Sequence, residues 1–226
     1  MNLVIDTGNT QTKLAVFTAH GRIVFKKAVK KISLALIKKI CLGYKIRAAI
    51  ISSVADQNKA IISFLEAHTR FTFFTHKTKI PVTNNYLTPK TLGRDRLANA
   101  IAASHLFPHQ NCLVIDAGTC IKYDVVTLKN EYLGGAISPG INMRYKALHA
   151  FTAHLPLIKP QPHVNLIGNS TSSAINSGVQ CGAVAEVQQL INEYHKQYKR
   201  LKIIITGGDA SLFVNQIKSH IFAAPD

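Results

Sequence analysis

Residues 4–13 read VIDTGNTQTK, and residues 114–122 read VIDAGTCIK. Each stretch has an apolar, strand-like run that ends in Asp, followed by a small residue, a Gly and a Thr-containing turn. The two aspartates, Asp6 and Asp116, lie 110 positions apart in a chain of 226 residues. A repeat at about half the chain length predicts two similar lobes with a site between them.

The chemistry of these turns suits an anion. A strand that ends in Asp-x-Gly presents a carboxylate beside a tight turn, and the Gly lets backbone N–H groups approach a phosphate closely. Two facing turns of this kind could hold the phosphates of one nucleotide. Asp6 would then lie near Mg²⁺ or its waters, with Thr10 and Lys13 near phosphate oxygens.

Both turns also have a purely structural interpretation. The residue types from Asp6 to Asn9 favour an ordinary hairpin turn, and Asp116 could cap its own turn. Two copies at matching places favour the phosphate interpretation. Asp116 is also expected to end a buried strand, where an unpaired carboxylate is costly and a bound cation would offset that cost.

The composition predicts a sizeable core, since 47% of the residues are hydrophobic and only 17% are charged. The net charge of +16 would attract anionic ligands or nucleic acid, but it could equally be general surface charge. The densest basic stretch, residues 26–39, has little aromatic interleaving. A nucleic-acid face is therefore not specifically indicated.

The four cysteines, Cys41, Cys112, Cys120 and Cys181, form no CxxC pair. This spacing favours reduced thiols in a cytoplasmic protein over a zinc site or a disulfide framework. Residues 1–8 have no basic region before an apolar segment, so we expect no signal peptide. No apolar run approaches the roughly 18 residues of a membrane span.

Hydrophobic periodicity predicts an α/β chain whose second half repeats the order of the first. In the first half we expect strands at 2–6, 12–18, 22–28, 46–52 and 71–75 and helices at 33–42, stopping at Gly43, and at 56–68. In the second half we expect strands at 111–116, 120–127, 131–137 and 202–206, with helices after Pro139–Gly140, over about 172–198, and at the end. The junction at Phe107–Asn111 divides the chain into lobes 1–108 and 109–226.

The stretch GRDRLANAIAA, residues 93–103, places Asp95 and Arg96 at the start of an apolar helix. The helix dipole favours a carboxylate there, so Asp95 could be a cap beside a solvated Arg96. The functional alternative is a general base, Asp95, next to an arginine that clamps the carboxylate of an anionic substrate. Phosphoryl transfer depends mainly on positioning and charge neutralisation, so one base would be enough.

Three glycine-containing loops complete the set of candidate motifs. GGAISPGI, residues 134–141, precedes a helix, and ITGGDA, residues 205–210, would let a flat ligand such as adenine approach the backbone. Plain turn chemistry is the alternative for both, and the second is the more suggestive because it sits where a nucleotide lobe would close. In GNSTSSAINSG, residues 168–178, Thr171 could bind substrate, although the local sequence favours helix capping.

Taken together, these motifs resemble the type III pantothenate kinase family, within the acetate and sugar kinase/Hsp70/actin superfamily. The resemblance spans nearly the whole chain. DTGNTQTK resembles the first phosphate motif of the family, GRDR its Gly-x-Asp-Arg motif and DAGT its second phosphate motif. Tyr86 stands seven residues before Gly93, as the substrate-binding Tyr of the family does. The implied fold is a pair of duplicated ribonuclease H-like, actin-like lobes. Each lobe would be a mixed sheet of three meandering strands plus alternating helices and strands.

The resemblance implies an enzyme that phosphorylates pantothenate to 4′-phosphopantothenate with ATP, the first step of coenzyme A biosynthesis. It implies Asp95 as the proton acceptor, and Asp116 as the ligand of a monovalent cation, K⁺ or NH₄⁺. Mg²⁺ would accompany ATP, and a cytoplasmic homodimer would complete its sites across the interface. The implied ATP-binding residues are Asp6, Thr7, Gly8, Asn9, Thr10, Gln11, Thr12, Lys13 and Thr119. The implied pantothenate-binding residues are Tyr86, Gly93, Arg94, Asp95, Arg96 and Thr171.

The chain departs from the family pattern at two positions. Ser170 stands where Asn is usual, and Cys120 follows Thr119 where Ala is common. Two other functions stay open on sequence alone: a kinase of the same superfamily acting on a sugar or a carboxylate, and a non-catalytic regulator that binds nucleic acid. The presence of Asp6, Asp95 and Asp116 argues against an inactive enzyme.

Overall fold

The computed structural model describes residues 1–8, 11–53 and 58–223. The chain forms two compact units. The first comprises Met1–Lys79 and Lys90–Asp95, and the second comprises Ile80–Pro89 and the chain from Arg96 onward. The lobe boundary at residues 108 and 109 stays a prediction about the duplicated architecture.

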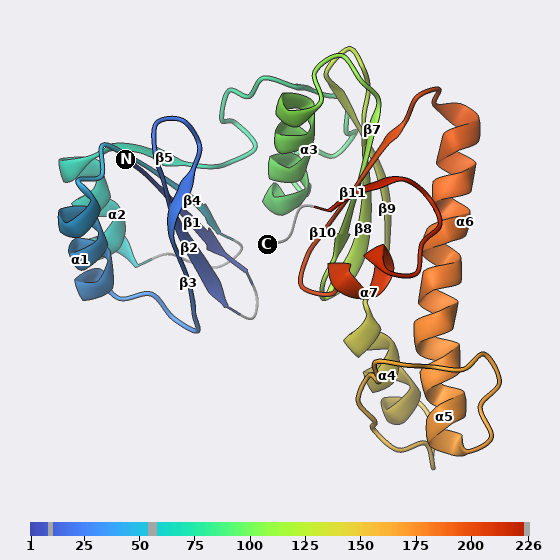
Figure 1. Cartoon of the computed structure of the whole chain (residues 1–226). Coiled ribbons are helices and arrows are strands. Elements are labelled where there is room, and N and C mark those ends of the chain that lie inside the picture. The colour runs from blue at the N-terminus through green and yellow to red at the C-terminus, as the bar shows by residue number, and fades with distance from the viewer. Residues whose placement is uncertain (9–10, 54–57, 224–226) are drawn as a thin grey trace. The chain divides into compact units, whose positions relative to one another are not determined.

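The first unit contains a five-stranded mixed sheet in the order β3-β2-β1-β4-β5 (Figure 1). Three strands form an antiparallel meander, and β4 and β5 add to β1 in parallel. The strands are β1 Asn2–Thr7, β2 Thr12–Phe17, β3 Ile23–Val29, β4 Ala48–Ser53 and β5 Arg70–Phe73. Helices α1 Leu34–Tyr44 and α2 Lys59–His68 alternate with the last two strands.

The second unit contains a six-stranded sheet in the order β11-β10-β7-β8-β9-β6. Its strands are β6 Thr83–Asn84, β7 Cys112–Ala117, β8 Cys120–Val126, β9 Glu131–Pro139, β10 Lys202–Thr206 and β11 Ile221–Ala223. Without β6, this order read in reverse is that of the first sheet: the third, second, first, fourth and fifth strands of each half. The predicted duplication of a three-stranded meander followed by alternating elements is therefore confirmed.

The remaining helices lie mostly in the second unit. They are α3 Arg94–Leu106, α4 Ile141–Ala150, α5 Thr171–Asn176, the π-helical turn η1 Ser177–Cys181, α6 Gly182–Gln197 and α7 Ala210–Val214. The single long helix expected over 172–198 is thus interrupted by a π-helical turn. Such turns are uncommon and often lie near functional sites.

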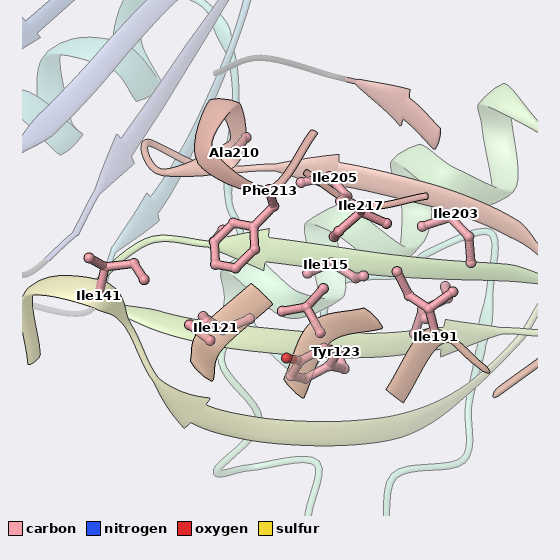
Figure 2. Packing of buried hydrophobic residues seen from close by; sticks show 14 of the residues in the cluster. Ile115, Ile121, Tyr123, Ile141, Ile191, Ile203, Ile205, Ala210, Phe213 and Ile217 are labelled. Carbon is pink, nitrogen blue, oxygen red and sulfur yellow. The ribbon is translucent and has the colours of Figure 1, made fainter. Parts of the chain in front are cut away.

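Each unit has its own apolar core. In the first unit, Leu3 and Ile5 of β1 pack with Ile37 of α1 and Leu65 of α2. In the second unit, alternate residues of β7, β8 and β10 face α6 and α7, as Figure 2 shows for Ile115, Ile121, Tyr123, Ile203, Phe213 and Ile191. Because side chains alternate along a strand, the even-numbered residues of β7 and β8 face the other way, toward α3 (Figure 1).

Three local expectations were wrong. Strands β6 and β11 were not predicted, because each is only two or three residues long. Strand β6 also pairs with a strand that is distant in sequence, β9. Helix α1 continues through Gly43 to Tyr44, since Lys45 ends it in a left-handed conformation with φ of 47°.

The first two lysines of the basic stretch do not share one face of the sheet. Lys26 and Lys27 are consecutive residues of the edge strand β3, so their side chains point to opposite faces of the sheet. Lysines on an edge strand discourage pairing with another sheet. No helix in the described part of the chain is both long enough and apolar enough to span a bilayer.

Candidate active site

The first Asp-x-Gly turn joins β1 to β2 in the first unit. Asp6 lies in register with Lys13 on the neighbouring antiparallel strand. The Gly8 N–H donates to the Gln11 carbonyl at 3.1 Å, and the Thr12 hydroxyl donates to that of Thr7 at 3.3 Å. Asn9 and Thr10 lie outside the described residues.

The second turn joins β7 to β8 and repeats this pairing. Asp116 lies in register with Lys122, and the Lys122 ammonium lies 2.6 Å from Asp116 Oδ2. The amide of Asn99 on α3 donates to the same oxygen at 3.5 Å. The strand that ends at Asp116 is buried, as expected, and the Asp116 side chain itself is 16% exposed and paired with Lys122. Lys122 supplies a positive charge that sequence reasoning did not assign.

Two glycines pack against the Ala117–Thr119 turn. A Cβ at Gly207 would lie 2.7 Å from Asp116 Oδ1 and closer still to the Ala117 carbonyl. A Cβ at Gly140 would clash with the carbonyls of Gly118 and Thr119. These close approaches bring the motifs at 134–141 and 205–210 onto the second Asp turn.

The junction after β10 is also tied to this turn by a hydrogen bond. The Asp209 N–H donates to the Ala117 carbonyl at 2.9 Å. Burial raises the pKa of the Asp209 carboxyl. Thr119 is exposed at the tip of the turn, which leaves it accessible to a ligand.

The GRDR segment uses its two arginines differently. Arg94 donates to the carbonyl of Ser53, at the end of β4, and its guanidinium lies 5.5 Å from the centre of the Phe73 ring. All three residues belong to the first unit. Asp95 is in the first turn of α3 and is partly exposed, as is Gly93 just before the helix.

Arg96 is 4% exposed and is held by Asp124 of β8. Its Nε donates to Asp124 Oδ1 at 2.9 Å, and its Nη2 lies 2.7 Å from the same oxygen. Burial lowers the pKa of Arg96, but the hydrogen bond and the charge of Asp124 outweigh this effect and the net direction is upward. Arg96 is therefore a buried, paired cation rather than a solvated one.

Tyr86 packs beside this ion pair in the second unit. Its backbone N–H donates to Asn84 Oδ1 at 3.0 Å. Its ring centre lies 5.5 Å from the Arg96 guanidinium and 6.1 Å from the ring centre of Tyr132. A Cβ at Gly134 would lie 2.9 Å from the Tyr86 ring, so the glycine makes room for the tyrosine.

In the polar segment 168–178, Ser170 caps the N-terminus of helix α5. Its hydroxyl accepts from the Ser173 N–H at 3.2 Å, and the Ser173 hydroxyl accepts from the Ser170 N–H at 2.9 Å. This reciprocal pair is a capping box. The expectation that Thr171 caps the helix was wrong: Thr171 is the first helical residue, and its side chain is exposed.

A cavity of about 690 Å³ lies along α7 in the second unit. It is lined by amide and hydroxyl side chains together with a few apolar ones. The lining residues are Pro162, His163, Val164, Asn165, Gln180, Ser211, Leu212, Asn215 and Gln216. Gln180, in the π-helical turn η1, is one of these lining residues. The sequence analysis did not predict this position for Gln180.

Sequence reasoning missed Asp124, Tyr132, Lys122 and Asn99. The available signal was a carboxylate in the apolar run IKYDVV, residues 121–126, since a buried charge needs a partner. Within the described residues, no three His, Cys, Asp or Glu side chains gather as a metal site.

Comparison with known structures identifies the class of fold. A Campylobacter jejuni protein assigned to the Baf family of transcriptional activators has a TM-score of 0.59 at 21% identity, covering 99% of this chain and 90% of that one. A Listeria monocytogenes protein assigned as an N-acetylmannosamine kinase has a TM-score of 0.52 at 15% identity, covering 99% and 92%. At these identities the likeness concerns the fold alone. Two mixed sheets of repeated topology place the chain among the ribonuclease H-like, actin-like proteins.

Sequence comparison identifies the family within that class. The family model described as type III pantothenate kinase matches residues 2–193. A type III pantothenate kinase of Flavobacterium johnsoniae is 44% identical over 225 residues, covering 99% of this chain and 92% of that protein. One from Christiangramia forsetii is 42% identical over 224 residues with the same coverage. The chain belongs to the type III pantothenate kinase family.

Proposed function

We propose that this protein transfers the γ-phosphoryl group of ATP to the 4′-hydroxyl of pantothenate and so catalyses the first step of coenzyme A biosynthesis. The observation that carries the proposal is similarity at 44% identity over 99% of the chain to a protein named for this reaction. The two Asp turns and the GRDR segment support it, because each supplies a group that phosphoryl transfer needs.

The nucleotide is assigned to the two turns. ATP phosphates would meet backbone N–H groups and hydroxyls of the first turn, and Thr119 of the second. The ATP-binding residues would be Asp6, Thr7, Gly8, Asn9, Thr10, Gln11, Thr12, Lys13 and Thr119. The cavity along α7 has the amide donors and acceptors and the apolar walls that a nucleobase needs, so we assign adenine to it.

The chemical step is assigned to Asp95. Its carboxylate would accept the proton of the pantothenate 4′-hydroxyl as that oxygen attacks the γ-phosphorus and ADP leaves. Mg²⁺ bound with ATP supplies neutralisation of the phosphate charge. Tyr86, Gly93, Arg94, Arg96 and Thr171 would line the pantothenate site with Asp95. Because Arg96 is already paired with Asp124, positioning is the better role for it than a direct carboxylate clamp.

Asp116 is assigned to a monovalent cation. The polar contacts of its carboxylate within the described residues both fall on Oδ2, so Oδ1, beside Gly207, can serve as a ligand. Lys122 already neutralises part of the charge at this carboxylate, which suits a monovalent ion better than a divalent one. The ion would offset phosphate charge beside the second turn.

Turnover is expected to rise when K⁺ replaces Na⁺ in the assay buffer. Asp116→Asn should abolish this difference and lower turnover in K⁺ by roughly tenfold or more, since a hydrogen bond or contact to a charged group contributes about 1.5–3 kcal/mol. The measurement is ADP release with ATP, Mg²⁺ and pantothenate at constant ionic strength. A wild type indifferent to K⁺ and Na⁺ would remove the cation assignment.

A homodimer is also part of the proposal. Segment 151–170 of the second unit exposes four large apolar side chains, Phe151, Leu157, Leu166 and Ile167. Exposed apolar surface becomes an interaction surface where such side chains gather, and we assign the dimer contact to this segment. We expect light scattering to give twice the chain mass. Phe151→Asp should shift the protein toward monomer and reduce pantothenate turnover, whereas Leu42→Asp, also an exposed apolar position, should leave the mass unchanged. A monomeric wild type would contradict the dimer.

The decisive test is ADP release by the purified protein with and without pantothenate. Pantothenate-dependent release supports the proposal. Release with a sugar or another carboxylate instead would indicate a different acceptor, and salt-sensitive DNA binding without any turnover would indicate a regulator.

Free thiols at all four cysteines support a cytoplasmic location, which we propose for the enzyme.

A further inference from the structure

The carboxylate of Asp124 organises a buried polar cluster in the second unit. Asp124 and Tyr132 are 0% exposed and Arg96 is 4% exposed. The Tyr132 hydroxyl donates to Asp124 Oδ1 at 2.7 Å, and Arg96 Nε donates to the same oxygen at 2.9 Å. One oxygen on β8 thus holds a side chain of α3 and a side chain of β9.

Stability alone does not explain why this part of the core contains a buried ion pair. A buried ion pair stabilises a fold little better than apolar residues of the same volume. It does fix the direction of its members, because each must keep its hydrogen bonds. Burial of Tyr132 raises the pKa of its hydroxyl, and the negative charge of Asp124 and the hydrogen bond to it raise that pKa further, so Tyr132 stays a donor.

The cluster ends at a residue assigned to the substrate. The Arg96 guanidinium lies 5.5 Å from the centre of the Tyr86 ring, within the range of a cation–π contact. The ring also lies close to the backbone of Gly134, where a Cβ would lie 2.9 Å from it. Tyr86 is only partly exposed, so one side of its ring rests on this support.

We propose that Asp124 is a positioning residue for the acceptor site, which it sets by holding Arg96 under the ring of Tyr86. The proposal rests on the assignment of Tyr86 and Arg96 to pantothenate. Asp124 acts through Arg96 and makes no contact with substrate. Its loss therefore alters binding of the acceptor and leaves binding of ATP unchanged.

The first test is Asp124→Asn, which keeps the shape and removes the charge. The expected result is a rise of about tenfold or more in the KM for pantothenate, because a hydrogen bond between charged groups is lost. The KM for ATP should stay within about twofold. Equal changes in both KM values, or a loss of activity that only follows a lower Tm, would overturn the proposal.

The second test is a double-mutant cycle with Arg96→Met. If Asp124 acts through Arg96, Asp124→Asn should change the pantothenate KM no further in the Arg96→Met background. The double variant should also have a higher Tm than Asp124→Asn alone, since it no longer buries an uncompensated charge. Additive changes in KM would overturn the proposal.

A milder pair of variants guards against misfolding. Tyr132→Phe removes only the hydroxyl that donates to Asp124 and should raise the pantothenate KM. Tyr123→Phe is the matched control: Tyr123 is also 0% exposed and also donates to a carboxylate, that of Glu186 at 3.2 Å. It should leave the pantothenate KM unchanged. Equal effects of both variants would show a general packing role and would overturn the proposal.

Failure of the proposed function can be distinguished from failure of the positioning role of Asp124. A wild type that turns over no pantothenate would overturn the proposed function, and with it the acceptor half of this inference. The Tm values of the double-mutant cycle need no substrate, so they decide the coupling of Asp124 to Arg96 in either case.

Discussion

Asp95→Asn is expected to lower pantothenate-dependent ADP release by about 10²–10⁴-fold at saturating substrates, the range typical of a general base. The amide keeps the size and shape of the carboxylate, but it cannot accept the hydroxyl proton. Asp95 lies in the first turn of α3, one residue before Arg96, whose ion pair with Asp124 fixes that turn. The variant should therefore change kcat more than either KM.

The structural interpretation of Asp95 predicts a different result. If the carboxylate only favours the helix dipole, its loss costs about 0.3–1 kcal/mol of stability and leaves turnover of the folded enzyme intact. Glu193→Gln is the control, because it removes one exposed carboxylate from α6. A combined measurement of Tm and single-turnover rate separates the two interpretations, and unchanged turnover would remove Asp95 as the base.

The two lobes were predictable from sequence because their signals are local. A consecutive apolar run followed by Asp and Gly marks the ends of β1 and β7, and the 110-residue spacing of Asp6 and Asp116 reports the duplication. The buried strand at 202–206 was predicted with the bounds that the structure has. Its three consecutive isoleucines, followed by a β-branched threonine, strongly favour a buried strand.

The ion pairs of the candidate site, Asp124 with Arg96 and Asp116 with Lys122, were not predictable from local sequence. Asp124 and Arg96 are 28 residues apart, and no local pattern says that β8 will bring one under the other. Lys122 was read as a strand residue, although the same register that places Lys13 beside Asp6 places it beside Asp116. Pairing of this kind is a property of the sheet rather than of a segment.

The local sequence did not decide which residue caps helix α5. Both Ser170 and Thr171 are residue types that cap helices. The reciprocal bonds between Ser170 and Ser173 decide in favour of Ser170. This leaves the exposed Thr171 side chain for a ligand, as the family resemblance implies.

Gly207→Ala is expected to have the largest effect on stability among single substitutions at the glycines that pack against the second turn. Gly207 has φ of 96°, a region that side chains other than Gly rarely adopt. A Cβ there would lie 2.7 Å from Asp116 Oδ1 and closer to the Ala117 carbonyl. Backbone strain of about 1–3 kcal/mol plus this clash should lower the Tm by roughly 5–15 °C.

The same substitution should also damage catalysis, because β7 and the junction after β10 cannot both keep their positions. Any shift of the Ala117–Thr119 turn moves Asp116 and Thr119 away from the phosphates, and a displacement of about 1 Å can cost on the order of 10²-fold in rate. ADP release measured well below the Tm, with ATP varied, would record this as a lower kcat/KM for ATP.

Gly208→Ala provides the matched comparison one residue further along. A Cβ at Gly208 would meet nothing within 4 Å, so its Tm should stay close to that of the wild type. A fall in ATP turnover in this variant without a fall in Tm would place a ligand against the exposed face of Gly208. Equal losses of Tm in both variants would instead mean that the junction tolerates no side chain at all, and the close approach of Gly207 to the Asp116 turn would not be the cause.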